Sequence, residues 1–332
     1  MPANLTPQYL KAEQKFRAAQ TTDEKVEAVK EMLSTLPKHK GTEKIYAELK
    51  HKLAEFKKEQ ETARKKGKQG PSFKVPREGA GQVVLIGYPN TGKSMLISKL
   101  TDANVQVADY PFTTRFPAPG MMKYEDIQIQ LVDTPPVTPT TMEPGMFDLV
   151  RSADAAMIVV DLGDDASLEQ IEWIIGRFAE AKIALVPLVA SNQCHTASDG
   201  VMPIRTFILG NKDDAEGAAD RLEVIKSLFG DKYMLLASSA ETGDGLGELI
   251  KKIYQFLDII RVYTKEPGQK PDLTAPFVLP RGSTLIDLAG RVHNDFRQTL
   301  KFARLWGTGA YSGQSVGREH VLNDKDVVEL HT

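Results

Sequence analysis

Three short motifs in this chain carry side chains suited to holding a nucleoside phosphate. The first is Gly87-Tyr-Pro-Asn-Thr-Gly92-Lys93-Ser94, which fits the pattern G-x-x-x-x-G-K-[ST]. Its glycines let the backbone wrap around a phosphate, so that successive N–H groups face the anion. Lys93 would bridge the β- and γ-phosphates, and the Ser94 hydroxyl would ligate Mg²⁺. The nucleotide contacts predicted here are Gly87, Asn90, Thr91, Gly92, Lys93, Ser94 and Met95.

The second motif is an aspartate that follows an apolar run. Leu131-Val132 ends an expected strand, so Asp133 would lie at the carboxyl edge of a parallel sheet, where ligands bind. At that edge Asp133 can hold Mg²⁺ through a water molecule. The residues therefore assign catalytic roles to Lys93 and Asp133.

The third motif, Asn211-Lys212-Asp213-Asp214, ends another expected strand. The Asp214 carboxylate can accept hydrogen bonds from N1–H and the exocyclic amine of guanine, whereas adenine offers no such pair of donors. An unpaired buried polar group costs about 1–3 kcal/mol, and more if charged, so this contact favours GTP over ATP. Lys212 would lie along the base, and Asn211 would tie this loop to the phosphate loop.

A fourth segment, Ser238-Ser239-Ala240-Glu241, follows the next expected strand. Ser239 and Ala240 are predicted to contact the base, with the Ala240 N–H donating to guanine O6. The order of these motifs, each at the end of a strand, predicts a guanine-nucleotide site for GTP and GDP.

Strands that alternate with helices must position these motifs. Val83–Ile86 is a continuous apolar run, typical of a parallel strand that is buried on both faces. Further strands are expected at 127–132, 156–160, 183–189, 206–209 and 233–237, and helices at 93–100, 167–180 and 218–229. A closing helix is expected over 245–263. This pattern predicts a doubly wound α/β domain over residues 82–260, and the motif Gly87–Ser94 places it in the P-loop NTPase class.

Two smaller regions flank this domain. Residues 1–68 show apolar positions at helical spacing in 23–36 and 42–58, separated by Pro37 and Gly41, which predicts an N-terminal helical hairpin. The hairpin becomes basic over 57–68, a pattern that fits either a solvated face or a contact with RNA phosphates. Residues 69–81 form a Gly- and Pro-containing linker.

The C-terminal region, residues 261–332, is expected to be a small α+β domain. Strands are predicted at 276–280 and 326–330. Thr284 and Asp287 have the spacing of a capping box, which predicts a helix that continues through Phe296.

Composition limits the remaining possibilities. The formal net charge is -2, which excludes a uniformly basic nucleic-acid binder, and we expect no DNA partner. No apolar run approaches the roughly 20 residues that a membrane-spanning helix needs. The single cysteine excludes an intramolecular disulfide. We therefore expect a soluble, cytoplasmic protein with no membrane partner.

With these motifs in view, the chain resembles a known family. Asp109-Tyr-Pro-Phe-Thr-Thr114 resembles switch I of the Obg-type translation GTPases. The segment from Val278-Leu-Pro-Arg-Gly-Ser-Thr to Asp326-Val-Val-Glu-Leu resembles a TGS domain, and the whole chain is most similar to the developmentally regulated GTP-binding branch. The resemblance implies an Obg-type G domain over residues 82–260 and a C-terminal β-grasp (TGS-like) domain. It also implies partners among the ribosome, structured RNA and translation factors.

The same resemblance implies two further site residues. Thr114 would be the catalytic switch I threonine that ligates Mg²⁺ together with Ser94 and Asp133, with Thr113 as the alternative. Asn90 occupies the position at which some relatives use an asparagine to hold K⁺ beside the phosphates. An ordinary turn residue is the alternative for Asn90.

One motif departs from the family pattern. Switch II is D-x-P-G in the family, but here it is Asp133-Thr-Pro-Pro136-Val137, and no glutamine follows it. Because proline has no N–H, Pro136 cannot donate the usual backbone hydrogen bond to the γ-phosphate. Two hypotheses follow: a slow Mg²⁺-dependent GTPase that regulates a process near the ribosome or RNA, or a nucleotide-sensing adaptor that binds RNA or protein and whose hydrolysis is vestigial.

Overall fold

The structure, a computed structural model, describes residues 7–18, 22–37, 42, 46, 49–53, 73–101, 116–188, 200–307 and 313–331. The chain divides into two compact units, Met1–Ser72 and Phe73–Thr332. The basic run at 57–68 and the predicted switch I at 109–114 lie outside the described residues.

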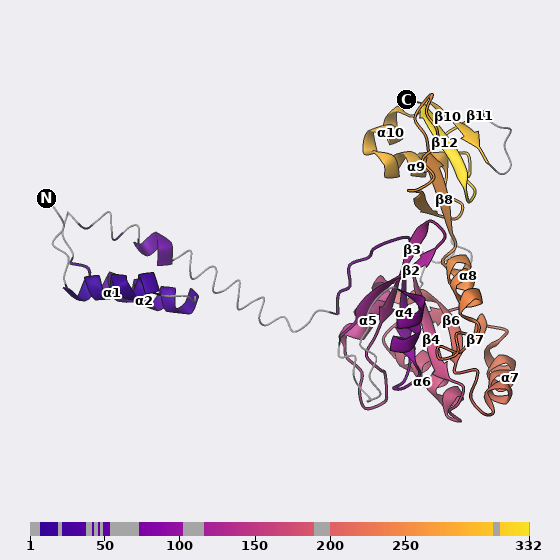
Figure 1. Cartoon of the computed structure of the whole chain (residues 1–332), viewed down its shortest axis with the longest axis horizontal. Coiled ribbons are helices and arrows are strands. Elements are labelled where there is room, and N and C mark those ends of the chain that lie inside the picture. The colour runs from indigo at the N-terminus through magenta and orange to yellow at the C-terminus, as the bar shows by residue number, and fades with distance from the viewer. Residues whose placement is uncertain are drawn as a thin grey trace. The chain divides into compact units, whose positions relative to one another are not determined.

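The N-terminal unit is built on the helices α1 (Pro7–Ala18) and α2 (Thr22–Thr35), which contact each other (Figure 1). Of the helix predicted over 42–58, only residues 42, 46 and 49–53 are described, and 46 and 49–53 are helical. All three segments contribute to one apolar core: Tyr9, Ala12, Val29, Met32, Leu36 and Leu49. A hairpin of two helices was therefore too simple a prediction, because Tyr9, Ala12 and Phe16 also recur at helical spacing and need burial.

The second unit begins with a seven-stranded sheet of order β2-β3-β1-β4-β6-β5, in which β7 also pairs with β6. Strand β2 pairs with β3 in antiparallel fashion, and the other pairs are parallel. The strands are β1 (Gln82–Ile86), β2 (Ala118–Tyr124), β3 (Ile127–Asp133), β4 (Ala155–Asp161), β5 (Ile183–Val186), β6 (Met202–Asn211) and β7 (Leu235–Ser238). The helices are α4 (Lys93–Leu100), α5 (Gly145–Ser152), α6 (Ser167–Glu180), α7 (Ala218–Phe229) and α8 (Leu246–Leu257).

Helices cover both faces of this sheet (Figure 1). Val83 and Leu85 belong to a core shared with α4 and α8, while Val84 and Ile86 belong to a core shared with α5, α6 and α7. Consecutive residues of a strand point to opposite faces, so a strand that is covered on both sides is largely apolar. Every residue of β1 is buried, including Gln82, whose side-chain amide donates to Gln130 at 2.7 Å.

The predicted helices at 93–100, 167–180 and 218–229 coincide with α4, α6 and α7. The predicted closing helix at 245–263 was wrong at its end. Helix α8 stops at Leu257, because Asp258 adopts a left-handed conformation (φ 53°) and ends the helix. The β-branched run after it forms strand β8 (Ile259–Thr264), which belongs to the second sheet.

The second sheet has five strands in the order β11-β10-β12-β8-β9. Its other strands are β9 (Phe277–Pro280), β10 (Phe302–Trp306), β11 (Gln314–Val316) and β12 (Asp326–His331). Helix α9 (Leu285–Val292) packs on one face of the sheet through Leu285, Leu288 and Ala289, and α10 (Asn294–Thr299) packs there through Phe296. The capping box of Thr284 and Asp287 is confirmed. The helix predicted through Phe296 is instead interrupted at His293, whose extended backbone (φ -162°) separates α9 from α10.

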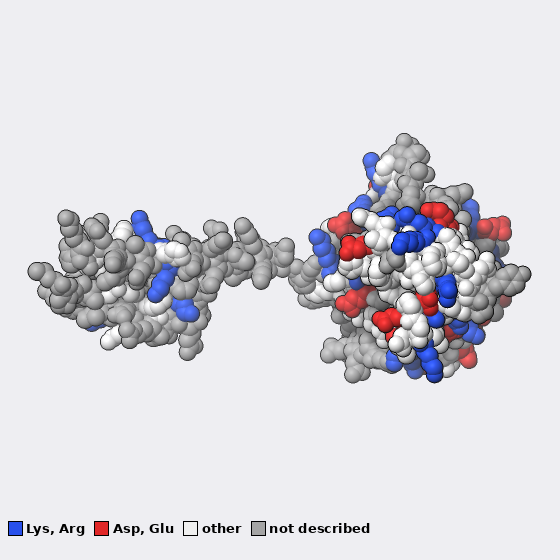
Figure 2. Space-filling model, turned by 90° about the horizontal axis from the view of Figure 1, so that it is seen from above, with Lys and Arg blue, Asp and Glu red and all other residues white. Residues whose placement is uncertain are grey.

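Charged side chains of both signs are interspersed over the face of the second unit that is seen in Figure 2. This mixing agrees with the small net charge of -2. Within the described residues no helix is both long and apolar enough to cross a membrane. The described part also contains no cluster of three or more His, Cys, Asp or Glu side chains placed to hold a metal ion.

A buried arginine joins the two sheets of the second unit. The Arg261 side chain, on β8, is 2% exposed. Its Nη1 donates to Glu125 (2.6 Å) and Asp126 (2.8 Å) in the turn between β2 and β3, and its Nη2 donates to Asp324 (2.8 Å) before β12. A buried charge is tolerated only when it is paired and hydrogen-bonded, and here three carboxylates meet that need. Arg261 thereby fixes the β2–β3 turn against the C-terminal sheet.

Aromatic rings complete the surroundings of this guanidinium. The rings of Tyr124 and Tyr254 stack with their centroids 4.4 Å apart, and Arg261 lies 5.7 and 5.1 Å from the respective centroids. The Tyr254 hydroxyl donates to Asp324 at 2.9 Å, and the Tyr263 hydroxyl donates to Asp126. Cation–π attraction adds to the ion pairs at this junction.

Replacement of Arg261 by methionine should destabilise the protein strongly, because Asp126 and Asp324 lose their cation and Glu125 keeps only its exposed partner Lys325. We expect a loss of about 3–5 kcal/mol in the free energy of unfolding, measured by denaturant titration of the full chain. The matched control is Arg281→Met. Its ion pair with Asp258 has the same length, 2.8 Å, but its side chain is 59% exposed, so about 1 kcal/mol or less should be lost. Equal losses in the two variants would contradict the structural role given to Arg261.

Candidate nucleotide-binding site

The phosphate loop joins the end of β1 to the start of α4, and its backbone leaves no room for side chains at two positions. A Cβ on Gly87 would lie 2.3 Å from the carbonyl oxygen of Val159. A Cβ on Gly92 (φ 86°) would lie 2.2 Å from Nδ2 of Asn211. Asn90, at the exposed tip, has a positive φ of 62°. Residues in such sparsely populated conformations gather at ligand-binding sites.

Lys93 places its ammonium inside this loop. Nζ donates to the carbonyl oxygens of Gly87 (2.9 Å) and Tyr88 (2.7 Å), and the residue is 6% exposed. Burial lowers the pKa of Lys93 to about 8, although the negative charge of Asp133 partly opposes this shift. An anion bound in the loop would therefore lie beside a cation. The negative charge of the anion would in turn favour the protonated form of Lys93.

Ser94 and Asp133 come together from α4 and the end of β3. The Ser94 hydroxyl donates to Asp133 Oδ2 at 2.6 Å, and Asp133 is fully buried. The next residue, Thr134, is anchored by its hydroxyl, which donates to the Leu85 carbonyl of β1. A hydroxyl beside a carboxylate supplies the hard oxygen atoms that Mg²⁺ prefers, so this pair fits the ion.

Asn211, the last residue of β6, connects the phosphate loop with the loop after β7. Its Nδ2 donates to the Thr91 carbonyl at 2.8 Å, and its Oδ1 accepts from the Ala240 N–H at 3.1 Å. The first bond is the link between loops that was expected of Asn211. The predicted bond from Ala240 to guanine O6 would require its N–H to leave Asn211. Ser239, also buried, accepts through Oγ from the Thr242 N–H.

Lys212 is held by an acidic residue that the sequence analysis did not single out. Its Nζ lies 2.6 Å from Oδ2 of Asp161, the last residue of β4, and its backbone has a positive φ of 63°. Asp161 follows an apolar strand just as Asp133 does, so the same signal could have found it. Asp214, two residues after Lys212 in the chain, is exposed, so its carboxylate can receive a ligand.

The segment after Asp133 is packed against the phosphate loop. The Val137 N–H donates to the Gly87 carbonyl at 3.1 Å, and the Val137 side chain is 1% exposed. Pro136, immediately before it, has no N–H to donate. Thr114 and its alternative Thr113 lie outside the described residues. Met95 is half-buried in α4 and packs against the apolar core.

The geometry therefore brings most of the predicted residues to one edge of the sheet. The phosphate loop, Asp133, the 211–214 loop and the 239–240 segment follow the carboxyl ends of β1, β3, β6 and β7. These strands run parallel to one another, so their ends meet at one edge. At this edge the phosphate loop with Lys93 suits the phosphates of a nucleotide. The oxygen atoms of Ser94 and Asp133 suit a divalent cation, and the polar 211–214 loop suits a base.

Comparisons with known proteins show which families this chain is similar to. Residues 82–190 match the family described as 50S ribosome-binding GTPase, and residues 260–332 match the TGS domain. Developmentally-regulated GTP-binding protein 1 of Xenopus laevis is 27% identical, over 88% of this chain and 94% of that protein. This chain is a homologue of the developmentally regulated GTP-binding proteins.

Two other relatives align with nearly the whole length of this developmentally regulated GTP-binding protein homologue. An uncharacterised GTP-binding protein of Methanocaldococcus jannaschii is 28% identical, over 93% of this chain and 92% of that protein. Ribosome-interacting GTPase 1 of Saccharomyces cerevisiae is 26% identical, over 93% and 99% respectively. The homologue is thus a GTP-binding protein of the P-loop GTPase class, with a G domain and a TGS domain. The predicted domain boundaries and the individual site residues remain predictions.

The depressed pKa of Lys93 predicts how GDP binding by this homologue depends on pH. Bound phosphates place negative charge beside the ammonium and raise its pKa, so binding takes up a proton wherever free Lys93 is deprotonated. The affinity for GDP should not change with pH below about pH 7. Above about pH 8 it should fall, and the fall should approach about tenfold for each pH unit. Calorimetry in buffers of different ionisation enthalpy should detect proton uptake at about pH 8.5 and little at about pH 7.

Lys93→Arg is the matched control, because a guanidinium keeps its proton throughout this range. Titration of the guanine base affects both proteins equally, so the difference between them isolates Lys93. The same proton uptake in both proteins would rule out the role given to the Lys93 ammonium.

Proposed function

We propose that this protein is a slow, Mg²⁺-dependent GTPase that acts in the cytoplasm as a regulatory factor associated with the ribosome or with RNA. The association is supported by the similarity to the yeast relative, which is named a ribosome-interacting GTPase. The family description over residues 82–190 also names the ribosome. GTP and GDP are the nucleotides exchanged at the site.

The observation that carries the proposal is the link from Asn211 to the phosphate loop. Its hydrogen bond to the Thr91 carbonyl holds the guanine loop against the phosphate loop. One ligand would therefore contact both loops. Asp214 would read the base by accepting two hydrogen bonds, and Lys212, held by Asp161, would lie along the base.

Ser94 and Asp133 are the residues that would hold Mg²⁺, with Thr114 as a third ligand by resemblance to the family. The ion, when bound, supplies positive charge to the phosphate oxygens. Lys93 and the N–H groups of the phosphate loop would add to this charge and would fix the orientation of the β- and γ-phosphates. The position of Asp133 is fixed in turn by the next residue, Thr134, whose hydroxyl donates a hydrogen bond to the Leu85 carbonyl of β1.

The chemistry is expected to be slow because switch II offers few donors to the γ-phosphate. Pro136 has no N–H, and the next N–H in the chain, that of Val137, donates to the Gly87 carbonyl. No glutamine follows to orient a water molecule. Water would then be positioned by the backbone, by a cation such as K⁺ held near Asn90, or by a partner.

The same observations favour a second candidate function. A nucleotide-sensing adaptor could bind GTP and GDP, contact RNA or protein, and hydrolyse GTP only vestigially. The donor-poor switch II, with Pro136 next to an engaged Val137, is the specific feature in its favour.

Pro136→Gly distinguishes the two candidates in a single-turnover assay of GTP hydrolysis. The variant restores an N–H beside the γ-phosphate. For the slow GTPase we expect a change of less than about threefold, whereas a vestigial enzyme should gain about tenfold or more, equivalent to about 1.4 kcal/mol in the barrier. Pro136→Ala supplies the same N–H without glycine's flexibility, and Pro139→Gly loosens the same segment without adding an N–H near the phosphates. A gain with Pro139→Gly alone would mean that stiffness, and not the missing donor, limits the rate.

The single-turnover rate should also be higher in K⁺ than in Na⁺ if Asn90 holds a monovalent cation beside the phosphates. Asn90 is exposed at the tip of the loop, where its side-chain oxygen is free to face such an ion. Asn90→Ala should abolish the difference between the two salts while leaving the rate in Na⁺ nearly unchanged. Equal rates of the unmodified protein in K⁺ and Na⁺ would remove this role.

Co-sedimentation with ribosomes tests the function as a whole. The full chain would be compared with a GTP analogue, with GDP and without nucleotide. Enrichment in the ribosomal fraction with the GTP analogue supports the regulatory role. Equal sedimentation in all three states, or none in any, contradicts it.

A further inference from the structure

Of the helices that the structure describes, α9 and α10 pack on the C-terminal TGS sheet, and both lie on the same face of it. On β10, Ala303 and Leu305 belong to the core beneath α9 and α10, so the alternate residues point to the other side. Register places Phe302 opposite His331, Arg304 opposite Glu329, and Trp306 opposite Val327. We name the face formed by these six residues the outer face.

The two ends of the outer face differ in their surroundings. Near its Val327 end, Arg261 and Lys325 are paired with Glu125 of the G domain. Strand β12 then runs about 17 Å from Asp326 to His331, at about 3.3 Å per residue. At the far end Phe302 is 36% exposed, and Lys301 and Arg304 are exposed. This far end is accessible to a ligand.

Two aromatic rings are already stacked at the accessible end. The rings of Phe302 and His331 lie 4.5 Å apart between centroids, with 9° between their planes. Such a pair presents a flat, preformed surface on which a further planar ring can stack. Stacking of a nucleobase on an aromatic side chain requires no particular base sequence, because every base has a π-face.

The charge of the outer face favours an anion. Its one carboxylate, Glu329, has a side chain only 5% exposed and is held by Lys265 at 2.9 Å and by His331 at 2.8 Å. The hydrogen bond from Lys265 contributes most to lowering the pKa of Glu329, so the carboxylate stays ionised and paired. Lys265 also lies 4.2 Å from the centre of the Trp306 ring. Among the described residues Lys301 and Arg304 form no ion pair, so their charges remain uncompensated.

We propose that the outer face binds an unpaired stretch of RNA, with a base stacked on the Phe302–His331 pair and neighbouring phosphates held by Lys301 and Arg304. Bases must be unpaired to stack in this way, because a duplex keeps its base faces covered. The assignment rests on the proposed association with RNA and names the surface that would make it. An acidic peptide would use the two cations but would have no need of the stacked rings.

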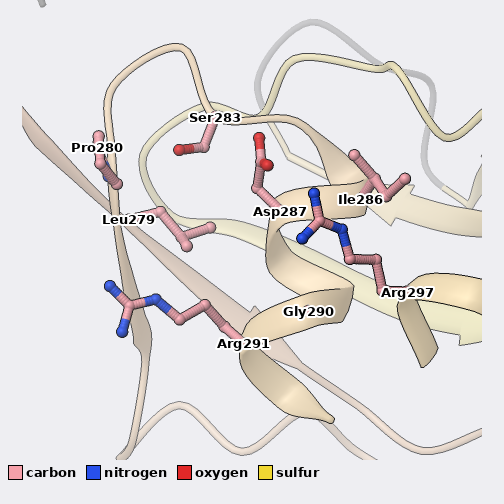
Figure 3. A pocket seen from close by; sticks show the side chains of 8 residues that line it. All are labelled: Leu279, Pro280, Ser283, Ile286, Asp287, Gly290, Arg291 and Arg297. Atoms are coloured by element: carbon pink, nitrogen blue, oxygen red, sulfur yellow. The ribbon is translucent and has the colours of Figure 1, made fainter. Parts of the chain in front are cut away.

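The arginines on the helical side of the same domain do not offer an equivalent site. Arg291 and Arg297 line a pocket of about 400 Å³ beside α9, together with Asp287 (Figure 3). In this view the two guanidinium groups point in different directions, and the Asp287 carboxylate lies nearer to Arg297. The pocket therefore does not present two cations to one phosphate. Arg291 supplies a matched control for Arg304, because both are exposed arginines of the same domain.

Fluorescence anisotropy of the full chain with a short labelled single-stranded RNA tests the proposal. Phe302→Ala should weaken binding roughly tenfold, and Phe302→Trp should retain it, because only the first removes the stacking surface. Arg304→Ala should weaken binding and should reduce the slope of log affinity against log salt by about 0.7, the value for one phosphate contact on a single strand. Arg291→Ala should leave both affinity and slope unchanged.

Other results would overturn the proposal. Phe302→Ala binding as tightly as the unmodified protein would exclude stacking. Equal losses for Arg304→Ala and Arg291→Ala would indicate only general attraction to positive charge. Stronger competition by an acidic peptide or by duplex RNA would assign the face to another partner. An unchanged melting temperature and unchanged GDP affinity in each variant establish that the protein is folded and that its G domain is intact.

Co-sedimentation and RNA binding together distinguish a wrong RNA surface from a wrong ribosomal role. If the Phe302 and Arg304 variants still co-sediment with ribosomes in the GTP-analogue state and lose no RNA affinity, the regulatory function stands and the outer face is not its RNA surface. If single-stranded RNA binds as described but ribosomes do not co-sediment, the outer face stands and the ribosomal role fails.

Discussion

Burial of the central strands on both faces is the constraint on which the nucleotide site depends. A strand covered by helices on each side buries nearly all of its side chains, so the side chains that must reach a ligand are placed at its ends. Strands β3, β4, β6 and β7 end in Asp133, Asp161, Asn211 and Ser238, respectively. Of these, Asp133 accepts a hydrogen bond from Ser94, Asp161 holds Lys212, and Asn211 donates to the phosphate loop. The same layered fold thus buries the apolar strands and places the polar residues of the site together at the strand ends.

Most of the G domain could be predicted because its signals are local. Helices α4, α6 and α7 and the phosphate loop are each specified within a few consecutive residues. Strand β2 was missed because its sequence, with Pro119 and Gly120, has poor strand propensity, which an edge strand tolerates. Asp161 follows an apolar strand as Asp133 does, but its role was missed because it depends on Lys212, which lies far away in the sequence and in another motif.

The junction of the two sheets could not be predicted for a different reason. A charged residue such as Arg261 in the middle of an apolar strand is usually an argument against burial. Its burial depends on Glu125, Asp126 and Asp324, which no pattern within β8 reveals. The same separation explains why the closing helix was predicted too long: the residues after Asp258 pair with β9 and β12, which follow later in the chain. Only tertiary pairing turns this segment into a strand.

The antiparallel hairpin of β2 and β3 has a structural consequence. Ala118, at its base, follows the predicted switch I by a few residues, and its turn carries Glu125 and Asp126, which bind Arg261. All seven residues of β2 are paired with β3, from Ala118 opposite Asp133 to Tyr124 opposite Ile127. The hairpin is therefore a continuous strand pair, about 20 Å long, that extends from the Asp133 end of the central sheet to the turn that contacts Arg261. The candidate site and the TGS sheet are thus joined through regular secondary structure as well as through the chain itself.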